Sequence, residues 1–254
     1  MDVHLIPAFA DNYIYLFRDP KTAMVGVVDP GEAAPVLAAL DRLGWKPDVI
    51  FNTHHHPDHV GGNRVLKQRF DCMIVGPRAE RERIPGLDVE LSEGQTWGFG
   101  GQDVRCIEVP GHTLGHIAFW LEKSSILFSG DTLFVMGCGR MFEGTAEQMW
   151  SSLQKLRGLP PETRFYCGHE YTLSNARFAA SIEPGNGAVG ERLARIASLR
   201  DAGQPTVPST IGEERVTNPF LRADDPALQA AVGMAGADPV RVLAEIRQRK
   251  NSFK

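Results

Sequence analysis

Short apolar runs alternate with amphipathic segments through the first 170 residues. The apolar runs are bounded by Asp, Pro and Gly, which predicts β-strands, and apolar residues at helical spacing between them predict helices. The predicted strands span 13–18, 24–29, 49–53, 72–75, 104–109, 117–121, 126–128 and 164–167, and the predicted helices span 32–43, 60–70 and 147–156. This mixture predicts helices packed on sheets, although periodicity does not set the number of sheets.

The pattern becomes helical after about residue 171. Apolar residues from Leu193 to Leu199 fall on one face of a predicted helix. Asp238-Pro239 has the form of an N-cap followed by proline at the first helical position, which predicts a last helix that runs through Ile246. We therefore predict two domains, residues 1–170 and residues 171–254, of which the second is helical.

Composition and charge exclude several classes of protein. The formal net charge of −4 argues against nucleic acid as a partner, since phosphate binding needs a basic face. The longest apolar runs have the length of strands, and the N-terminus lacks a basic segment followed by a long apolar core. These features predict a cytoplasmic protein with no signal peptide and no membrane partner. We expect a monomer, although no sequence feature sets the oligomeric state.

One seven-residue segment concentrates residues that can bind a metal: Thr53-His54-His55-His56-Pro57-Asp58-His59. If the preceding strand stays extended, the first and third histidines project to one side and the second points away. The proline cannot continue a central strand, so the chain must turn there. That turn can bring the aspartate and the last histidine back beside the first pair. Four nitrogen and oxygen ligands in one loop suit zinc or another borderline metal.

Three further candidate ligands follow later strands. His112, Asp131 and His169 each come directly after a predicted strand, and a glycine precedes each of them. Glycine allows the backbone to approach closely. Any one of these residues alone would more often be structural, so the argument depends on their recurrence at the same kind of position. Seven ligands are too many for one tetrahedral zinc, but they fit two metals that share one group and leave room for water.

These motifs resemble those of the metallo-β-lactamase superfamily. The order H-x-H-x-D-H, G-H-T, S-G-D and G-H-E is similar to its metal-binding motifs, and within the superfamily the chain resembles glyoxalase II, the hydroxyacylglutathione hydrolases. Further similarities lie in segments 28–31, 137–145, 168–172, 208–211 and 218–222 and in the basic C-terminal ending. The resemblance covers the chain from Asn12 onward. It implies an α+β fold, an αββα metallo-β-lactamase sandwich with a C-terminal helical domain.

The resemblance also implies two divalent metal ions per chain. One would be held by His54, His56 and His112 and the other by Asp58, His59 and His169, while Asp131 would bridge them. We expect zinc, and iron or manganese would suit the same ligands. The hypothesis is that a hydroxide between the ions attacks a thioester carbonyl, with Asp58 and Asp131 as the catalytic residues that orient it. Asp29 is a candidate to fix the tautomers of the ligand imidazoles.

The implied glutathione-binding residues lie near the metals and in the helical domain: Arg140, Phe142, Tyr171, Arg247 and Lys250. Glutathione carries two carboxylates, so its site needs cations at the rim. Arg247 and Lys250 lie three positions apart on a predicted helix, and they therefore share a face that can clamp one carboxylate. Without the resemblance, this pair would be interpreted as part of a solvated basic tail.

Two positions depart from the family pattern. Phe142 stands where many members have tyrosine, which removes one donor to the peptide and predicts weaker or less specific glutathione binding. Asn251 stands where aspartate is usual, and we expect this change to affect only how the tail is held. Neither change falls on a predicted metal ligand.

The implied function is hydrolysis of S-(2-hydroxyacyl)glutathione thioesters, such as S-D-lactoylglutathione to D-lactate and glutathione, the second step of methylglyoxal detoxification. A thiolate leaves without a strong general acid, because its conjugate acid has a pKa of about 8.5. One alternative is a glutathione persulfide dioxygenase that uses a single iron, although such enzymes lack the long helical domain. A β-lactamase or lactonase is less consistent with Asp58 and Asp131, and a non-catalytic metal-storage protein has no need of seven ligands.

Overall fold

Strand β2 (Asn12–Arg18) separates two layers of core in the computed structural model. Successive side chains of a strand point to opposite faces. Ile14 and Leu16 belong to a core cluster shared with helices, whereas the ring of Phe17 lies 4.6 Å from the ring of Phe99 in a second sheet. The alternation seen in the sequence therefore lets one strand join two layers.

The structure describes residues 1–253, and their contacts define two units. The first unit comprises residues 1–108 and 114–130, and the second comprises residues 109–113 and the chain from residue 131 onward. Among the described residues, every helix is too short or too polar to cross a lipid bilayer. The predicted division of the chain at residue 171 stays a prediction.

The first unit contains two β-sheets. Its strands are β1 (Asp2–Ala8), β2, β3 (Val25–Val28), β4 (Val49–Phe51), β5 (Met73–Pro77), β6 (Val89–Leu91), β7 (Thr96–Phe99), β8 (Gln102–Glu108), β9 (Ile117–Leu121) and β10 (Ile126–Gly130). One sheet has the order β1-β2-β3-β4-β5-β6, antiparallel up to β3 and parallel beyond it. The other runs β10-β9-β8-β7, and every pair is antiparallel.

Helices cover the outer face of the first sheet, and aromatic rings fill the space between the sheets. The helices of this unit are α1 (Ala33–Leu43), α2 (Pro57–Val60) and α3 (Asn63–Phe70), with 3-10 turns η1 (Arg78–Glu80) and η2 (Glu122–Ser124). Leu40 of α1 and Leu66 of α3 join Ile14 in one core cluster. On the inner face, the ring of Phe51 lies 5.1 Å from the ring of Phe119. The first unit is thus a sandwich with helices outside.

The prediction of a single helix over residues 60–70 is wrong at its start, because Gly61 and Gly62 separate α2 from α3. The amide of Gly62 donates a 2.7 Å hydrogen bond to the carbonyl of Pro30. A Cβ atom on Gly61 would lie 2.5 Å from the carbonyl oxygen of Gly31, and one on Gly62 would lie 2.6 Å from that of Pro30. Only glycine permits this approach, which holds the turn after β3 against the histidine loop.

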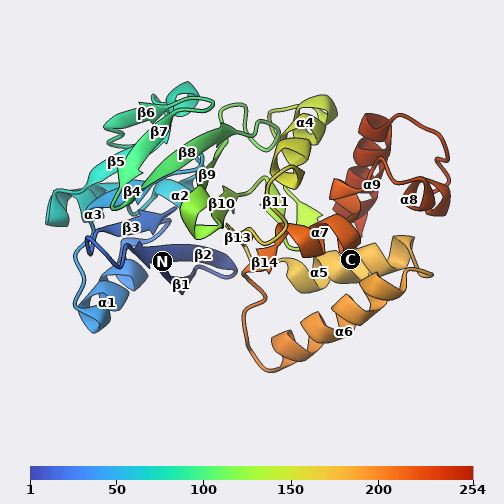
Figure 1. The fold of residues 1–254 in the computed structure, drawn as a ribbon, viewed down its shortest axis with the longest axis horizontal. Helices are drawn as coiled ribbons and strands as arrows, with labels where there is room; N and C mark the ends of the chain where they lie inside the picture. The colour runs from blue at the N-terminus through green and yellow to red at the C-terminus, as the bar shows by residue number, and fades with distance from the viewer. Residues whose placement is uncertain (254) are drawn as a thin grey trace. The chain divides into compact units, whose positions relative to one another are not determined.

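The second unit is mostly helical. Its helices are α4 (Ala146–Arg157), α5 (Thr172–Ile182), α6 (Gly187–Asp201), α7 (Ile211–Thr217), η3 (Pro219–Leu221), α8 (Pro226–Ala231) and α9 (Pro239–Ser252). Strand β11 (Leu133–Phe134) pairs with β12 (Gly137–Cys138), and β13 (Arg164–Cys167) pairs with β14 (Ser209–Thr210). Helices α5 and α6 lie side by side, and α4 packs against α9 (Figure 1). The predicted start of the last helix is confirmed, since Asp238 caps it and Pro239 occupies its first position.

Candidate metal centre

The histidine loop begins where β4 ends. The Nε2 atom of His54 lies 3.0 Å from the Nδ1 atom of His56, so the two rings turn toward a common point. The intervening His55 points away, and its Nδ1 lies 2.8 Å from the carboxylate of buried Glu80. Pro57 starts helix α2 and turns the chain. These positions agree with the alternation expected from the sequence.

The turn brings the other two residues of the loop together as well. The Nε2 atom of His59 lies 3.6 Å from Oδ2 of Asp58. A carboxylate oxygen and an imidazole nitrogen at this separation can both reach one ion, because metal–ligand bonds of about 2.0–2.2 Å place two ligands of a zinc roughly this far apart. The loop therefore presents two pairs of donors.

Asp29 fixes the imidazole tautomers in this loop. Its carboxylate accepts hydrogen bonds from the amide of Thr53 at 2.8 Å and from its hydroxyl at 2.7 Å, and it lies 3.1 Å from Nδ1 of His59. Because a carboxylate only accepts, His59 must carry its proton on Nδ1. The Thr53 hydroxyl donates its only proton to Asp29, so it can only accept a hydrogen bond from Nδ1 of His54, which lies 3.0 Å away. Both rings are left with an Nε2 lone pair for a metal.

The second unit brings its own three predicted ligands together. Oδ2 of Asp131 lies 3.2 Å from Nε2 of His169 and 3.5 Å from Nε2 of His112. Nδ1 of His112 lies 2.8 Å from the carbonyl of Arg140, which fixes the proton on Nδ1 and leaves Nε2 as a lone-pair donor. A Cβ atom at position 139 would lie 2.0 Å from the carbonyl oxygen of Asp131, so Gly139 is required for this loop to pass. One carboxylate oxygen thus lies beside two imidazole nitrogens.

The seven predicted ligands therefore form two groups, four in the first unit and three in the second. The donor set fits divalent transition metals, since it consists of imidazole nitrogens and carboxylate oxygens. Within each unit, the tautomers of His54, His59 and His112 place their Nε2 lone pairs toward the neighbouring ligand atoms. The chain thus has histidine and aspartate clusters able to bind metal.

The structure shows aromatic contacts around two of these ligands, His54 and His169, that the sequence prediction missed. Buried His116 stacks on His54, with ring centroids 4.6 Å apart. Tyr171 stacks almost parallel on His169 at 4.8 Å, and Phe134 meets the ring of Tyr171 edge-on. His116 also follows a glycine, but it stands before strand β9 rather than after a strand, so the ligand pattern used for the sequence did not select it.

The predicted substrate-binding residues lie in the second unit. Arg140 is exposed, and Phe142 is 62% exposed with its ring 5.2 Å from that of His112. Arg247 is buried: it donates a 2.8 Å hydrogen bond to the carbonyl of Cys138, and its Nε has no hydrogen-bond partner among the described residues. Lys250 donates to Ser174 at 2.6 Å. The expected face shared by Arg247 and Lys250 is present on α9.

Electrostatics make Lys250 unusual. Burial lowers the pKa of its ammonium group to about 8, and repulsion from Arg247 and Arg140 acts in the same direction. The rings of Phe178 and Phe253 lie within cation–π range of its Nζ, at 5.9 and 5.5 Å. Arg247 and Arg140 are thus close enough to lower the pKa of Lys250, and a bound anion would stabilise this group of cations.

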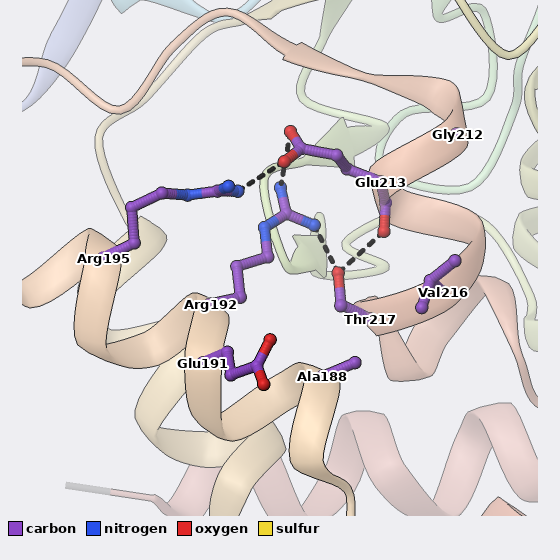
Figure 2. Close-up of a pocket in the computed structure, with 8 residues that line it drawn as sticks. All are labelled: Ala188, Glu191, Arg192, Arg195, Gly212, Glu213, Val216 and Thr217. Atoms are coloured by element: carbon purple, nitrogen blue, oxygen red, sulfur yellow. Dashed lines mark hydrogen bonds and ion pairs between the residues drawn. The ribbon is translucent and has the colours of Figure 1, made fainter.

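A separate pocket of about 350 Å³ lies between α6 and α7, and Figure 2 shows the side chains that line it. None of the predicted metal or substrate residues lines this pocket. Its most buried cation, Arg192, donates to Thr217, Ser209 and Glu214, so its hydrogen-bonding capacity is used inside the fold. This pocket therefore has a structural cation at its base and no evident anion site.

The sandwich and its histidine and aspartate loops, which are able to bind metal, define a protein of the metallo-β-lactamase class. The family model described as the metallo-beta-lactamase superfamily matches residues 9–169. A second model, described as the hydroxyacylglutathione hydrolase C-terminus, matches residues 170–253. The chain belongs to the hydroxyacylglutathione hydrolase family. The family and fold predicted from the sequence are confirmed.

Two relatives support this assignment along the whole length. The hydroxyacylglutathione hydrolase of Methylococcus capsulatus is 52% identical over 254 residues, which cover 100% of this chain and 99% of the relative. The hydroxyacylglutathione hydrolase of a Synechococcus strain is 55% identical, and the similarity covers 100% of this chain and 100% of the relative. The similarity therefore includes both the metal-binding loops and the basic C-terminal helix.

Solved structures share the fold at lower identity. ETHE1 from Myxococcus xanthus has a TM-score of 0.71 and 24% identity, covering 99% of this chain and 92% of that protein. The protein TTHA1623 in a di-iron-bound form has a TM-score of 0.60 and 26% identity, covering 85% of this chain and 98% of that protein.

Proposed function

We propose that this chain hydrolyses S-(2-hydroxyacyl)glutathione thioesters, with S-D-lactoylglutathione as the expected substrate and D-lactate and glutathione as products. This reaction is the second step of methylglyoxal detoxification. The observation that supports it most is the position of the Asp131 carboxylate beside two imidazole nitrogens in a chain 52% identical to a hydroxyacylglutathione hydrolase. The basic face of α9 adds a suitable site for an anionic peptide.

The proposal assigns the ligands to two divalent ions. His54, His56 and His112 would hold one ion, Asp58, His59 and His169 would hold the other, and Asp131 would be shared by the two. Zinc is the expected metal, with iron or manganese as alternatives; the di-iron-bound form of TTHA1623 is consistent with a pair of ions. When bound, such a pair lowers the pKa of water towards neutrality and polarises a carbonyl oxygen.

The remaining chemistry belongs to the chain's own residues. Asp29, Thr53 and the carbonyl of Arg140 hold protons on Nδ1 of their histidines and keep the Nε2 lone pairs directed at the site. Asp58 and Asp131 act as the catalytic carboxylates that orient the attacking water. The leaving thiolate needs no proton from the protein, because the pKa of a thiol is about 8.5.

Binding of glutathione is assigned to the cationic and aromatic residues of the second unit. Lys250 and Arg247 attract a carboxylate, and the buried Nε of Arg247 offers a donor to it. Arg140 and Tyr171 are exposed beside the ligands His112 and His169, where they can contact the peptide. Phe142 contributes an apolar contact and no hydrogen bond, so we expect weaker recognition of the peptide at that position.

We expect the KM for S-lactoylglutathione to rise about tenfold between pH 7 and pH 9.5. The ammonium of Lys250 has a pKa of about 8, so it is charged below this pH and neutral above it, whereas the substrate carboxylates stay anionic. A hydrogen bond to a charged group contributes about 1.5 kcal/mol, which corresponds to roughly tenfold in affinity. Initial rates across this range, corrected for spontaneous hydrolysis, measure the effect.

The Lys250→Arg variant is the control, because a guanidinium remains charged throughout this range. Its KM should stay flat where that of the unchanged enzyme rises. Lys250→Ala should have a raised KM at every pH. A rise of the same size in Lys250→Arg would assign the pH dependence to another group.

The experiment that tests the proposed function follows the loss of S-lactoylglutathione absorbance with purified protein, alongside metal analysis. Hydrolysis that is abolished by a chelator and restored by zinc supports the proposal. A protein that binds two ions and leaves the thioester intact contradicts it.

The alternative is a glutathione persulfide dioxygenase, which the metallo-β-lactamase fold alone would equally allow. The match of residues 170–253 to the hydroxyacylglutathione hydrolase C-terminus favours the hydrolase. Oxygen consumption with glutathione persulfide and one bound iron would identify the dioxygenase instead. A cytoplasmic location and a monomeric state stay predictions.

A further inference from the structure

Asn12 is the first residue of β2 and lies far in sequence from the histidine loop, yet its side chain contacts that loop. Its Nδ2 donates a 2.9 Å hydrogen bond to Oδ2 of Asp58 and a 3.3 Å hydrogen bond to the carbonyl oxygen of the same residue. Asn12 is only 6% exposed, whereas the side chain of Asp58 is 40% exposed. A buried amide thus holds a half-exposed carboxylate.

The oxygen that Asn12 binds is the one nearest the neighbouring ligand. Oδ2 of Asp58 lies 3.6 Å from Nε2 of His59. A carboxylate oxygen has two lone pairs, and the amide of Asn12 occupies one of them. The same oxygen lies on the side of His59. Without the amide, this carboxylate could rotate into solvent and bind water instead.

The backbone of Asp58 is fixed from another side by the turn after β3. A Cβ atom on Gly31 would lie 2.0 Å from the carbonyl oxygen of Asp58, so the turn packs directly on it. The same turn carries Asp29, which adopts a left-handed φ of 49° while it binds His59. Asp58 and His59 are therefore placed by two different parts of the first sheet. Strand β2 holds Asp58 through Asn12, and the turn after β3 holds His59 through Asp29.

We propose that Asn12 is a positioning residue for the ion held by Asp58 and His59, because its amide fixes the carboxylate of Asp58 in the orientation that binds the metal. The inference rests on the proposed function, in which Asp58 is a ligand. Hydrogen-bond partners of metal ligands commonly change metal affinity by about 10–100-fold when they are removed. The expected effect of Asn12 falls in this range and is confined to one of the two ions.

The test removes the amide and measures each ion separately. Asn12→Leu keeps the number and branching of the side-chain heavy atoms and has no donor. Metal analysis after equilibration at a series of buffered free zinc concentrations gives the affinity of each ion, and a thermal melt of the metal-free protein measures folding. We expect the first ion to bind as in the unchanged protein and the second to bind about 10–100-fold more weakly. In Asn12→Leu, raising free zinc should restore kcat without changing KM. A purely structural role of Asn12 predicts no such recovery, because zinc would not repair a misfolded site.

Two further variants make the result specific. Gln102→Ala is the matched control, since this amide bonds only to Ser124 and to none of the predicted ligands. It should leave both ions unaffected. In the background of Asp58→Ala, the Asn12→Leu change should cause no additional loss of zinc, because Asn12 acts through Asp58. If Asn12→Leu does not fold, Asn12→Ala takes its place, since it removes the same donor.

Two outcomes would overturn the inference: unchanged affinity of the second ion in Asn12→Leu, or an equal loss of both ions that accompanies a lower melting temperature of the metal-free protein. An additive loss in the double variant would overturn it as well. The thioester assay on the unchanged protein separates this result from the proposed function. Two bound ions without hydrolysis would end the proposed function, whereas unchanged zinc affinity in Asn12→Leu would end only the role of Asn12.

Discussion

Asp131→Asn is expected to lower kcat for S-lactoylglutathione by about 10²–10³-fold, the typical loss when a group that stabilises charge at a reacting centre is removed. The carboxylate oxygen of Asp131 lies within 3.5 Å of the Nε2 atoms of both His112 and His169. An asparagine has almost the same shape, but its amide oxygen carries no full charge. The variant should therefore fold normally and retain fewer bound ions.

Asp224→Asn is a matched control in the same unit, because it removes one charge from a half-exposed aspartate that pairs with Arg157. It should leave kcat and metal content unchanged. Rates and metal content measured on the same samples decide the result. Full activity of Asp131→Asn with two ions still bound would exclude the bridging role.

Glu214→Ala is expected to destabilise the metal-free protein by about 3–5 kcal/mol, the usual range when one partner of a buried ion pair is removed. Glu214 is fully buried and accepts hydrogen bonds from Arg192, from Ser209 at 2.7 Å, from the amide of Met136 at 2.8 Å and from Asn218 at 2.9 Å. Its loss leaves the buried Arg192 guanidinium with only the longer 4.0 Å ion pair to Glu213. The metal-free protein is required because bound ions would mask part of the loss.

Glu213→Ala is the comparison for this prediction: Glu213, the neighbouring residue on α7, pairs with exposed Arg195 and lies 4.0 Å from Arg192, so its contact with that guanidinium is weaker than that of Glu214 (Figure 2). Exposed pairs contribute about 0–1 kcal/mol, so its effect should be small. Urea denaturation of both variants gives the comparison. Equal destabilisation by the two changes would show that the buried network around Arg192 contributes no special stability.

The Glu214 network also supports the loop that carries Asp131. Met136 adopts a left-handed φ of 59°, which costs free energy for a residue with a side chain, and Glu214 binds its amide. Asn218 donates to the carbonyls of Phe134 and Gly137 in the same loop. The helical part of the second unit therefore holds a metal-ligand loop in place, in addition to presenting Arg247 and Lys250.

Strands and helices with a strong apolar period could be predicted from the sequence. For the elements that the prediction missed, the structure gives a physical reason. Strand β1 was missed because it is an edge strand that contains Pro7 and several half-exposed residues. Helix α5 was missed because its buried face includes Asn175, which donates to the carbonyl of Val135. A polar residue that is buried with a distant partner breaks the period that sequence analysis depends on.

The sequence by itself determined the types of the candidate ligands and their order, because imidazoles and carboxylates that follow strands are local features. Only the tertiary structure decided what orients them. Asn12 and Asp58 are separated by 46 residues, His55 and Glu80 by 25, and Met136 and Glu214 by 78. A hydrogen bond between such residues depends on how the chain folds back on itself, and no local pattern specifies its partner.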